Sequence, residues 1–84
     1  MSVHWTPKDG RWTGEVNGVR LYTVRSSTAH GDLRKQYPHA LDHRLPFAPI
    51  RRVFRTPEAA QEYAERHLQA AMLHLGYVKQ EPQS

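Results

Sequence analysis

The dipeptide Asn17-Gly18 constrains the fold of this chain more than any other local feature. It stands between two runs of strand-forming residues, WTGEV and VRLYTV, where Asn-Gly is typical of a two-residue hairpin loop with positive φ at both centres. The loop predicts that Val16 lies opposite Val19, with side chains alternating between the two faces of the ribbon. The predicted core face carries Trp12, Val16, Val19 and Leu21, and the predicted outer face carries Arg11, Thr13, Glu15, Arg20, Tyr22 and Val24.

A second turn, PKDG at 7–10, precedes this hairpin. In a four-residue turn the proline fixes φ early and the glycine closes the turn late. Such a turn pairs Thr6 with Arg11 and Trp5 with Trp12, so that the two indoles stack on the core face. In the alternative, Trp5 only anchors an irregular N-terminus. The predicted sheet therefore has three or four strands.

The segment 26–49 is predicted to be a long loop. It holds three prolines, a glycine and several Ser, Thr and Asp residues, which argue against a regular strand. A short helix over 38–44 would place proline in its first turn. Connections of this length in compact domains are usually functional or partly disordered, so this loop is the expected place for specificity.

The second half of the chain predicts a strand followed by a helix. IRRVFR at 50–55 reads as a strand. Thr56 and Pro57 then supply an N-cap and a proline at the first helical position, and Gly76 is a natural C-terminal stop. Between them, apolar residues recur at three- and four-residue steps and form one stripe. The stripe consists of Ala60, Tyr63, Ala64, His67, Leu68, Ala71, Met72 and Leu75.

These elements predict an α+β fold in which a three- or four-stranded antiparallel sheet packs on one C-terminal α-helix. A chain of 84 residues suffices for one domain, so we expect a single compact domain over 1–76 and a flexible tail over 77–84. The sequence has no cysteine, and we find neither a signal peptide nor a membrane span. We therefore expect no disulfide, no membrane association and a cytoplasmic location in a bacterium or an infected host cell.

No motif in the sequence predicts catalysis or a cofactor. The chain lacks a glycine-flanked serine elbow and a phosphate-binding glycine loop, so we expect a non-enzymatic protein. His39 and His43 stand four residues apart in HALDH, a spacing that on a helix presents two metal ligands on one face. Exposed loop histidines are the alternative, and the sequence leaves the choice open. His67 and His74 are interpreted as half-buried packing residues at the margin of the helix stripe.

Positive charge is concentrated in the first two thirds of the chain. Residues 1–55 contain ten Lys and Arg against four Asp and Glu, whereas 56–84 contain two against four. Such a field suits DNA or an acidic surface of a host protein, and arginines around an exposed tyrosine can hold phosphates and touch bases. Arginines on a sheet also protect its edges, which is the structural alternative. The predicted binding residues are Arg11, Arg20, Tyr22, Arg25, Arg34, Lys35, Arg44, Arg51 and Arg55.

Two stretches, GRWTGEVNGVRLYTV and RRVFRTPEAAQEYAERHL, resemble the arm-type DNA-binding module at the N-terminus of phage-type tyrosine recombinases. The junction FRTPEA at 54–59 is similar to the strand-to-helix transition of that family. The resemblance covers roughly half of the chain and implies a three-stranded sheet placed in the major groove of DNA. The loop before the third strand departs from the short turn of the family. The contacts implied by the resemblance are Arg11, Arg20, Tyr22, Arg51 and Arg55.

Two functions are consistent with these features. The first is a small basic DNA-binding protein encoded by a phage or mobile element, which contacts DNA through a basic sheet face. The second is a protein-binding inhibitor or adaptor of the anti-defence type, which docks on a host complex that handles nucleic acid. The sequence leaves the partner, the preferred DNA sequence and the oligomeric state open.

Overall fold

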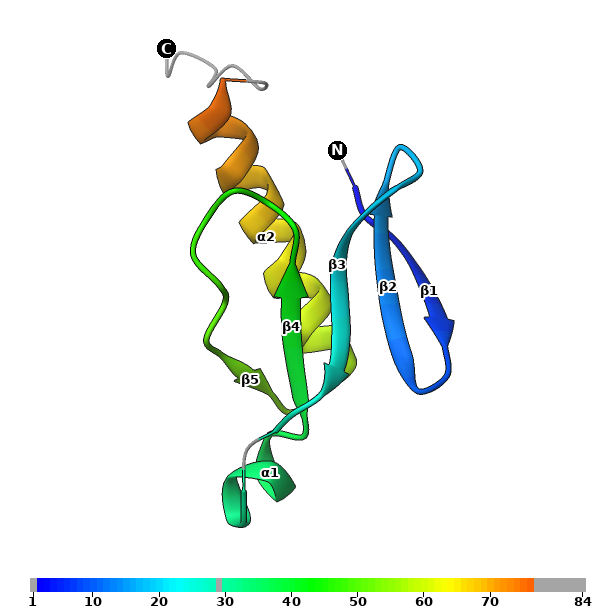
Figure 1. Ribbon diagram of the computed structural model, residues 1–84, viewed down its shortest axis with the longest axis vertical. Coiled ribbons are helices and arrows are strands. Elements are labelled where there is room, and N and C mark those ends of the chain that lie inside the picture. The colour runs from blue at the N-terminus through cyan, green and yellow to red at the C-terminus, as the bar shows by residue number, and fades with distance from the viewer. Residues whose placement is uncertain (1, 29, 77–84) are drawn as a thin grey trace.

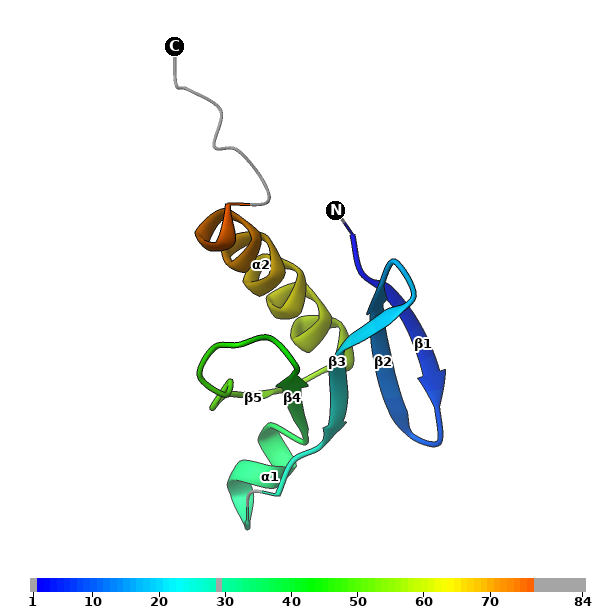
Figure 2. The same cartoon turned by 45° about the horizontal axis from the view of Figure 1, so that its top comes forward.

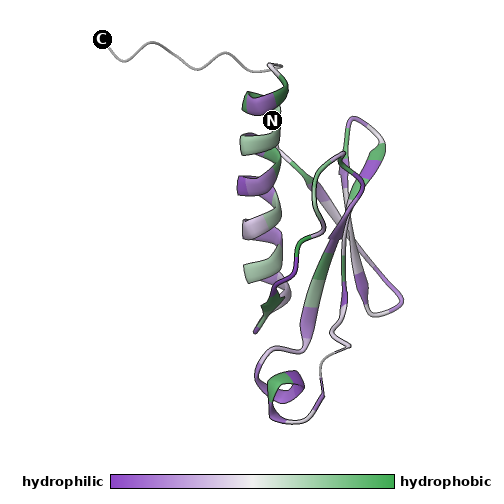
Figure 3. Cartoon of the chain, turned by 60° about the vertical axis from the view of Figure 1, so that its left-hand side comes forward, coloured by the Kyte–Doolittle hydropathy of each residue, from purple (hydrophilic) through white to green (hydrophobic). Residues whose placement is uncertain are grey.

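A computed structural model describes residues 2–28 and 30–76, and it shows a five-stranded antiparallel sheet with a long helix along one face. Figure 1 shows the strands in chain order, and Figure 3 shows helix α2 as a layer separate from the sheet. The α+β prediction is confirmed, with five strands where three or four were expected. The elements are β1 (His4–Lys8), β2 (Arg11–Val16), β3 (Val19–Ser26), α1 (Asp32–Gln36), β4 (His39–His43), β5 (Val53–Phe54) and α2 (Pro57–Leu75).

The first two hairpins turn over two residues each. Asn17-Gly18 has φ of 52° and 79°, as predicted for a loop whose twist matches that of its strands. Asp9-Gly10 adopts the same conformation, with φ of 51° and 76°, so the predicted four-residue turn is wrong. Pro7 instead belongs to β1, an edge strand, where its missing N–H costs no ladder bond.

The shorter turn changes the partners of both tryptophans. Trp5 lies opposite Gly14, and Trp12 lies opposite Pro7, so the predicted Trp5–Trp12 pair is wrong. A Cβ on Gly14 would come within 2.7 Å of the Trp5 ring and of a Val3 methyl. Glycine at this point therefore lets the indole and Val3 lie directly against the backbone of β2, and both tryptophans still pack against the core.

A β-bulge between β2 and β3 corrects the predicted register. Glu15 pairs with Arg20 as expected, but Gly14 then pairs with Tyr22 rather than Leu21. The extra residue turns Tyr22 and Val24 toward α2, and each is only 1% exposed. The predicted exposure of Tyr22 on the outer face is therefore wrong. Glycines in strands often mark such bulges, because they accept a close backbone or side-chain approach.

The segment 26–49 holds more regular structure than predicted. Its short helix is α1, which Figures 1 and 2 place beyond the end of the sheet, and the predicted helix over 38–44 is instead strand β4. β4 pairs with β3, Leu41 opposite Val24, and Leu41 is 1% exposed. Leu41 is buried, whereas Ala40 and Asp42 on either side of it are more exposed, and this is the alternation of a strand. The alternation outweighs the prolines and histidines that suggested a loop.

The strand-to-helix junction forms as predicted, although the strand is shorter. β5 comprises only Val53–Phe54 of the predicted 50–55. The hydroxyl of Thr56 accepts a hydrogen bond of 3.1 Å from the backbone N–H of Ala59, and Gly76 closes α2 in the left-handed conformation. The stripe is buried at Ala60, Ala64, Leu68 and Ala71, whereas Leu75 is 43% exposed. The predicted tail over 77–84 lies outside the described residues.

Candidate functional site

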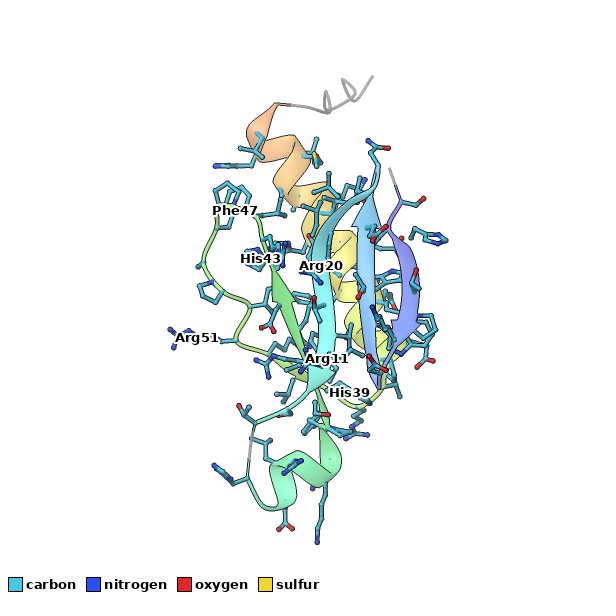
Figure 4. The ribbon with its side chains drawn as sticks, turned by 45° about the vertical axis from the view of Figure 1, so that its right-hand side comes forward. Arg11, Arg20, His39, His43, Phe47 and Arg51 are labelled. Atoms are coloured by element: carbon cyan, nitrogen blue, oxygen red, sulfur yellow. The ribbon has the colours of Figure 1, made fainter. Side chains whose placement is uncertain are left out.

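Polar and basic side chains gather on the face of the sheet that points away from α2. They line two adjoining shallow hollows of about 550 Å³ and about 410 Å³, which share Lys8, Thr13, Arg20 and Arg44. In Figure 4 the labelled Arg11 and Arg20 project from this side of the sheet, with α2 behind. We call this surface the outer face. Its charged and threonine residues are Thr6, Lys8, Asp9, Arg11, Thr13, Glu15, Arg20, Thr23, Arg25, Asp42 and Arg44.

Strand pairing explains why these residues meet. The two-residue turn at Asp9-Gly10 sets Lys8 directly opposite Arg11, and the Asn17-Gly18 turn sets Glu15 opposite Arg20. Arg44 follows β4 and donates its backbone N–H to the carbonyl of Leu21 over 2.9 Å. The pairing of β1 to β4 thus brings five basic and three acidic side chains from residues 8–44 onto one surface.

One ion pair organises the end of this face. Arg25 donates from Nε and Nη2 to the two carboxylate oxygens of Asp42, and from Nη1 to the carbonyl of Ser26 over 3.1 Å. The two side chains are 33% and 53% exposed, so the pair adds little stability and mainly fixes the guanidinium in place. Elsewhere on the outer face, no ion pair within residues 2–28 and 30–76 neutralises Lys8, Arg11, Arg20 or Arg44.

The predicted binding residues divide into two groups. Arg11, Arg20, Arg25 and Arg44 come together on the outer face. The other five lie elsewhere. Tyr22 is buried beneath α2, and Arg34 and Lys35 belong to α1. Arg51 lies on the connection from β4 to β5, at the left edge of the view in Figure 4. Arg55 holds its guanidinium 5.4 Å from the Tyr37 ring centre.

Sequence reasoning missed Lys8 and Thr23 of this face. Lys8 was assigned to a turn, although Asp9-Gly10 alone is a sufficient turn signal and would have placed Lys8 in a strand. Thr23 was missed for a different reason. The bulge at Leu21 moves Thr23 to the outer face, opposite Thr13, and Gly14 within the partner strand is a weak local signal of that bulge.

A second cluster lies on the opposite face, between the sheet and α2. The Tyr22 hydroxyl lies 2.8 Å from Nδ1 of His67, and the His67 and His43 ring centroids are 4.7 Å apart. Nδ1 of His43 accepts the backbone N–H of Leu45 over 3.1 Å, and its Nε2 lies 2.8 Å from the carbonyl of Ala48. Nε2 therefore carries the proton of neutral His43, and this histidine holds the connection after β4.

The His67 ring is poorly suited to carry charge. Burial lowers its pKa, and the nearby His43 lowers it further; burial also raises the pKa of the Tyr22 hydroxyl, so that it stays protonated. Phe47 and His74 complete a shallow hollow of about 360 Å³ beside His67, with Ala70 and Ala71 as its other lining residues. The prediction that His67 is a half-buried packing residue is confirmed, whereas His74 is exposed.

The structure also bears on the two histidines of HALDH. They lie on a strand, His39 opposite Ser26 and Phe54, and His43 opposite Tyr22 at the other end of β4. Among residues 2–28 and 30–76, no group of three or more His, Cys, Asp or Glu side chains is arranged to hold a metal ion.

The lowered pKa of His67 predicts that acid destabilises the fold. A histidine in an unfolded chain has a pKa of about 6.5, and the pKa of His67 in the folded protein is lower. Below about pH 6.5 the unfolded state therefore binds this proton more readily than the folded state, and the free energy of unfolding falls. Thermal melts at about pH 7.5 and about pH 5 should show the loss. His67→Gln should reduce this pH dependence, and the exposed His30→Gln should leave it unchanged. Equal pH dependence in both variants would contradict the assignment.

Comparisons with known proteins give no family for the chain. No protein-family model matches it, and neither the curated proteins nor the solved structures include a significant match. No helix in the described part of the chain is both long and apolar enough to cross a membrane.

Proposed function

We propose that this protein binds duplex DNA through the outer face of its sheet and performs no catalysis. The observation that carries the proposal is the set of four basic residues, Lys8, Arg11, Arg20 and Arg44, that share one surface without an ion pair from the described residues. Like charges on a surface repel one another, and this cost is offset when phosphates lie against them. Threonine hydroxyls between them add hydrogen-bond donors for phosphate or base edges.

The absence of aromatic rings on the outer face favours duplex over single-stranded nucleic acid. Proteins bind single strands largely by stacking bases on aromatic side chains. None of the residues that line the two outer hollows is aromatic. Trp5, Tyr22 and Phe54 instead pack in or against the core. A surface with charges and hydroxyls but no stacking platform is suited to a partner whose bases remain paired.

A second candidate is an acidic surface of a host protein. It is favoured by the acidic residues of the outer face, since Asp9, Glu15 and Asp42 stand among the basic ones. Against phosphates these carboxylates are repulsive, whereas a protein partner can supply a lysine or arginine for each. The arrangement of alternating charge then provides specificity, and salt acts mainly on the association rate.

The salt dependence of DNA binding tests the proposal. We expect a fluorescently labelled duplex of about 20 base pairs to bind at about 50 mM salt and to lose affinity by about two orders of magnitude at about 200 mM, as four phosphate contacts require. The measurement is fluorescence anisotropy at several salt concentrations. If no duplex binds even at the lowest salt, the proposal fails; recovery of one stoichiometric protein from nuclease-treated bacterial lysate would then support the second candidate.

A further inference from the structure

The threonines of the outer face form a row across three strands. Thr6 lies opposite Thr13, and Thr13 lies opposite Thr23. We call these three residues the threonine row. Thr23 is in turn opposite Asp42, whose carboxylate is held by Arg25. The row depends on the bulge at Leu21, because without that extra residue Thr13 would face Tyr22.

Basic residues flank the threonine row on both sides. On one side of the threonine row, two residues further along β1 and β2, Lys8 lies opposite Arg11. Arg25 continues this line on β3, because its neighbour Val24 pairs with Trp12, the neighbour of Arg11. Two residues in the other direction, Arg20 lies opposite Glu15, and Arg44 is tied to β3 through the carbonyl of Leu21. The outer face therefore has an uncharged strip of hydroxyls and methyls between two lines that carry positive charge.

The dimensions of this pattern agree with those of a major groove. Strands lie about 4.8 Å apart, so the threonine row spans about 10 Å, or about three base-pair steps of 3.4 Å. Four residues along a strand separate the two basic lines by about 13 Å, and the major groove is about 12 Å wide. The basic lines can then reach the phosphates on the two walls while the threonine row faces the floor.

The chemistry of threonine selects one feature of that floor. The C5-methyl group of thymine projects into the major groove, and threonine methyls are among the side-chain groups that contact it. A β-branched side chain in a strand has few rotamers, so the direction of its methyl is well defined. Thr13 and Thr23 are half-buried between their basic neighbours, and Thr6 is exposed, so the row is both ordered and accessible.

We propose that the threonine row reads the C5-methyl groups of thymine in the major groove, which makes A·T-containing duplex DNA the preferred ligand. This inference rests on the proposed function, because it requires the outer face to bind duplex DNA. The two basic lines hold the phosphates and set the affinity. The threonine row sets the difference in affinity between a duplex whose bases carry the methyl group and one whose bases lack it.

The test compares two duplexes that differ only in this methyl group. One contains A·T pairs, and the other has the same sequence with deoxyuridine in place of thymidine. The wild-type protein should bind the thymine duplex more tightly by about fourfold for each methyl group contacted. The phosphate charge is the same in both, so the salt dependence of the two affinities should be equal.

Paired substitutions then assign the preference to the threonine row. Thr13→Ser with Thr23→Ser removes both threonine methyls and keeps the hydroxyls, and it should bring the two affinities close together. Thr13→Val with Thr23→Val keeps the methyls and removes the hydroxyls, and it should retain the preference for thymine. Thermal melts of both variants establish that they fold.

The outcomes separate the inference from the proposed function. If the wild type binds both duplexes equally and with a steep salt dependence, the thymine inference is overturned and the DNA-binding proposal stands. If the serine variant keeps the full preference, the methyl is read by another residue and the inference is also overturned. If neither duplex binds the wild type at low salt, the proposed function fails, and the inference fails with it.

Discussion

Arg11→Ala combined with Arg20→Ala should weaken duplex binding by about tenfold or more and make the slope of log affinity against log salt about two units shallower. Both guanidinium groups belong to the outer face, one on β2 and one on β3. Both residues are exposed, so the double variant should melt within a few degrees of the wild type. Fluorescence anisotropy over a salt series measures the two effects together.

Arg51→Ala combined with Arg55→Ala is the matched control. It removes the same charge, but Arg51 lies on the connection before β5, and Arg55 is placed against Tyr37. The resemblance to the arm-type module implies that Arg51 and Arg55 contact DNA. The outer face, however, contains Arg11, Arg20 and Lys8 and contains neither Arg51 nor Arg55. We therefore expect the control to keep most of its affinity. Equal losses in the two double variants would show that net charge alone governs binding.

Tyr22→Ala should reduce the free energy of unfolding by about 3–5 kcal/mol, as truncation of a large core ring usually does. That loss is a large fraction of the stability of a small domain. The reason is the bulge, which turns Tyr22 from the outer face into the core, where it is 1% exposed. A chemical-denaturation curve or a thermal melt measures the loss. A melt close to that of the wild type would mean that Tyr22 lies on the outer face after all.

Tyr22→Phe separates the ring from its hydroxyl. The ring remains, and only the hydrogen bond to His67 is lost. We expect a cost of about 1 kcal/mol, the usual net value of one such bond. DNA binding by this variant should be unchanged, since the hydroxyl points away from the outer face. A Tyr22→Phe variant that loses DNA affinity would place Tyr22 in the binding surface.

The parts of the fold that local chemistry determines were predictable. The Thr56 hydroxyl and the left-handed Gly76 bound α2 as expected, because capping depends on a few adjacent residues. Asn17-Gly18 fixed its own turn for the same reason. The buried alanines of α2 also follow from periodicity alone.

The parts that depend on packing were not predictable from local signals. The bulge arises where Gly14 lets Trp5 and Val3 lie against β2, and those partners come from a different strand. β4 was predicted as loop and helix because its histidines and aspartate carry no strand propensity, and only Leu41 reports its burial. A register error of one residue was enough to exchange Thr23 and Tyr22 between the two faces of the sheet. The predicted outer face therefore included Arg11 and Arg20 correctly and Tyr22 wrongly.

The order of the sheet also has a consequence for how the chain reaches its native state. Each strand pairs with the strand that comes next in the sequence, so the meander pairs only neighbouring segments of the chain and can begin to form during synthesis. Its inner face, with Tyr22, Val24 and Leu41, is covered only when α2 arrives from residues 57–75. Until the ribosome has released that helix, the nascent sheet exposes an apolar surface. Ribosome stalling or truncation before residue 57 would therefore yield a fragment prone to aggregation, whereas loss of residues within α1 would leave the meander and its cover intact.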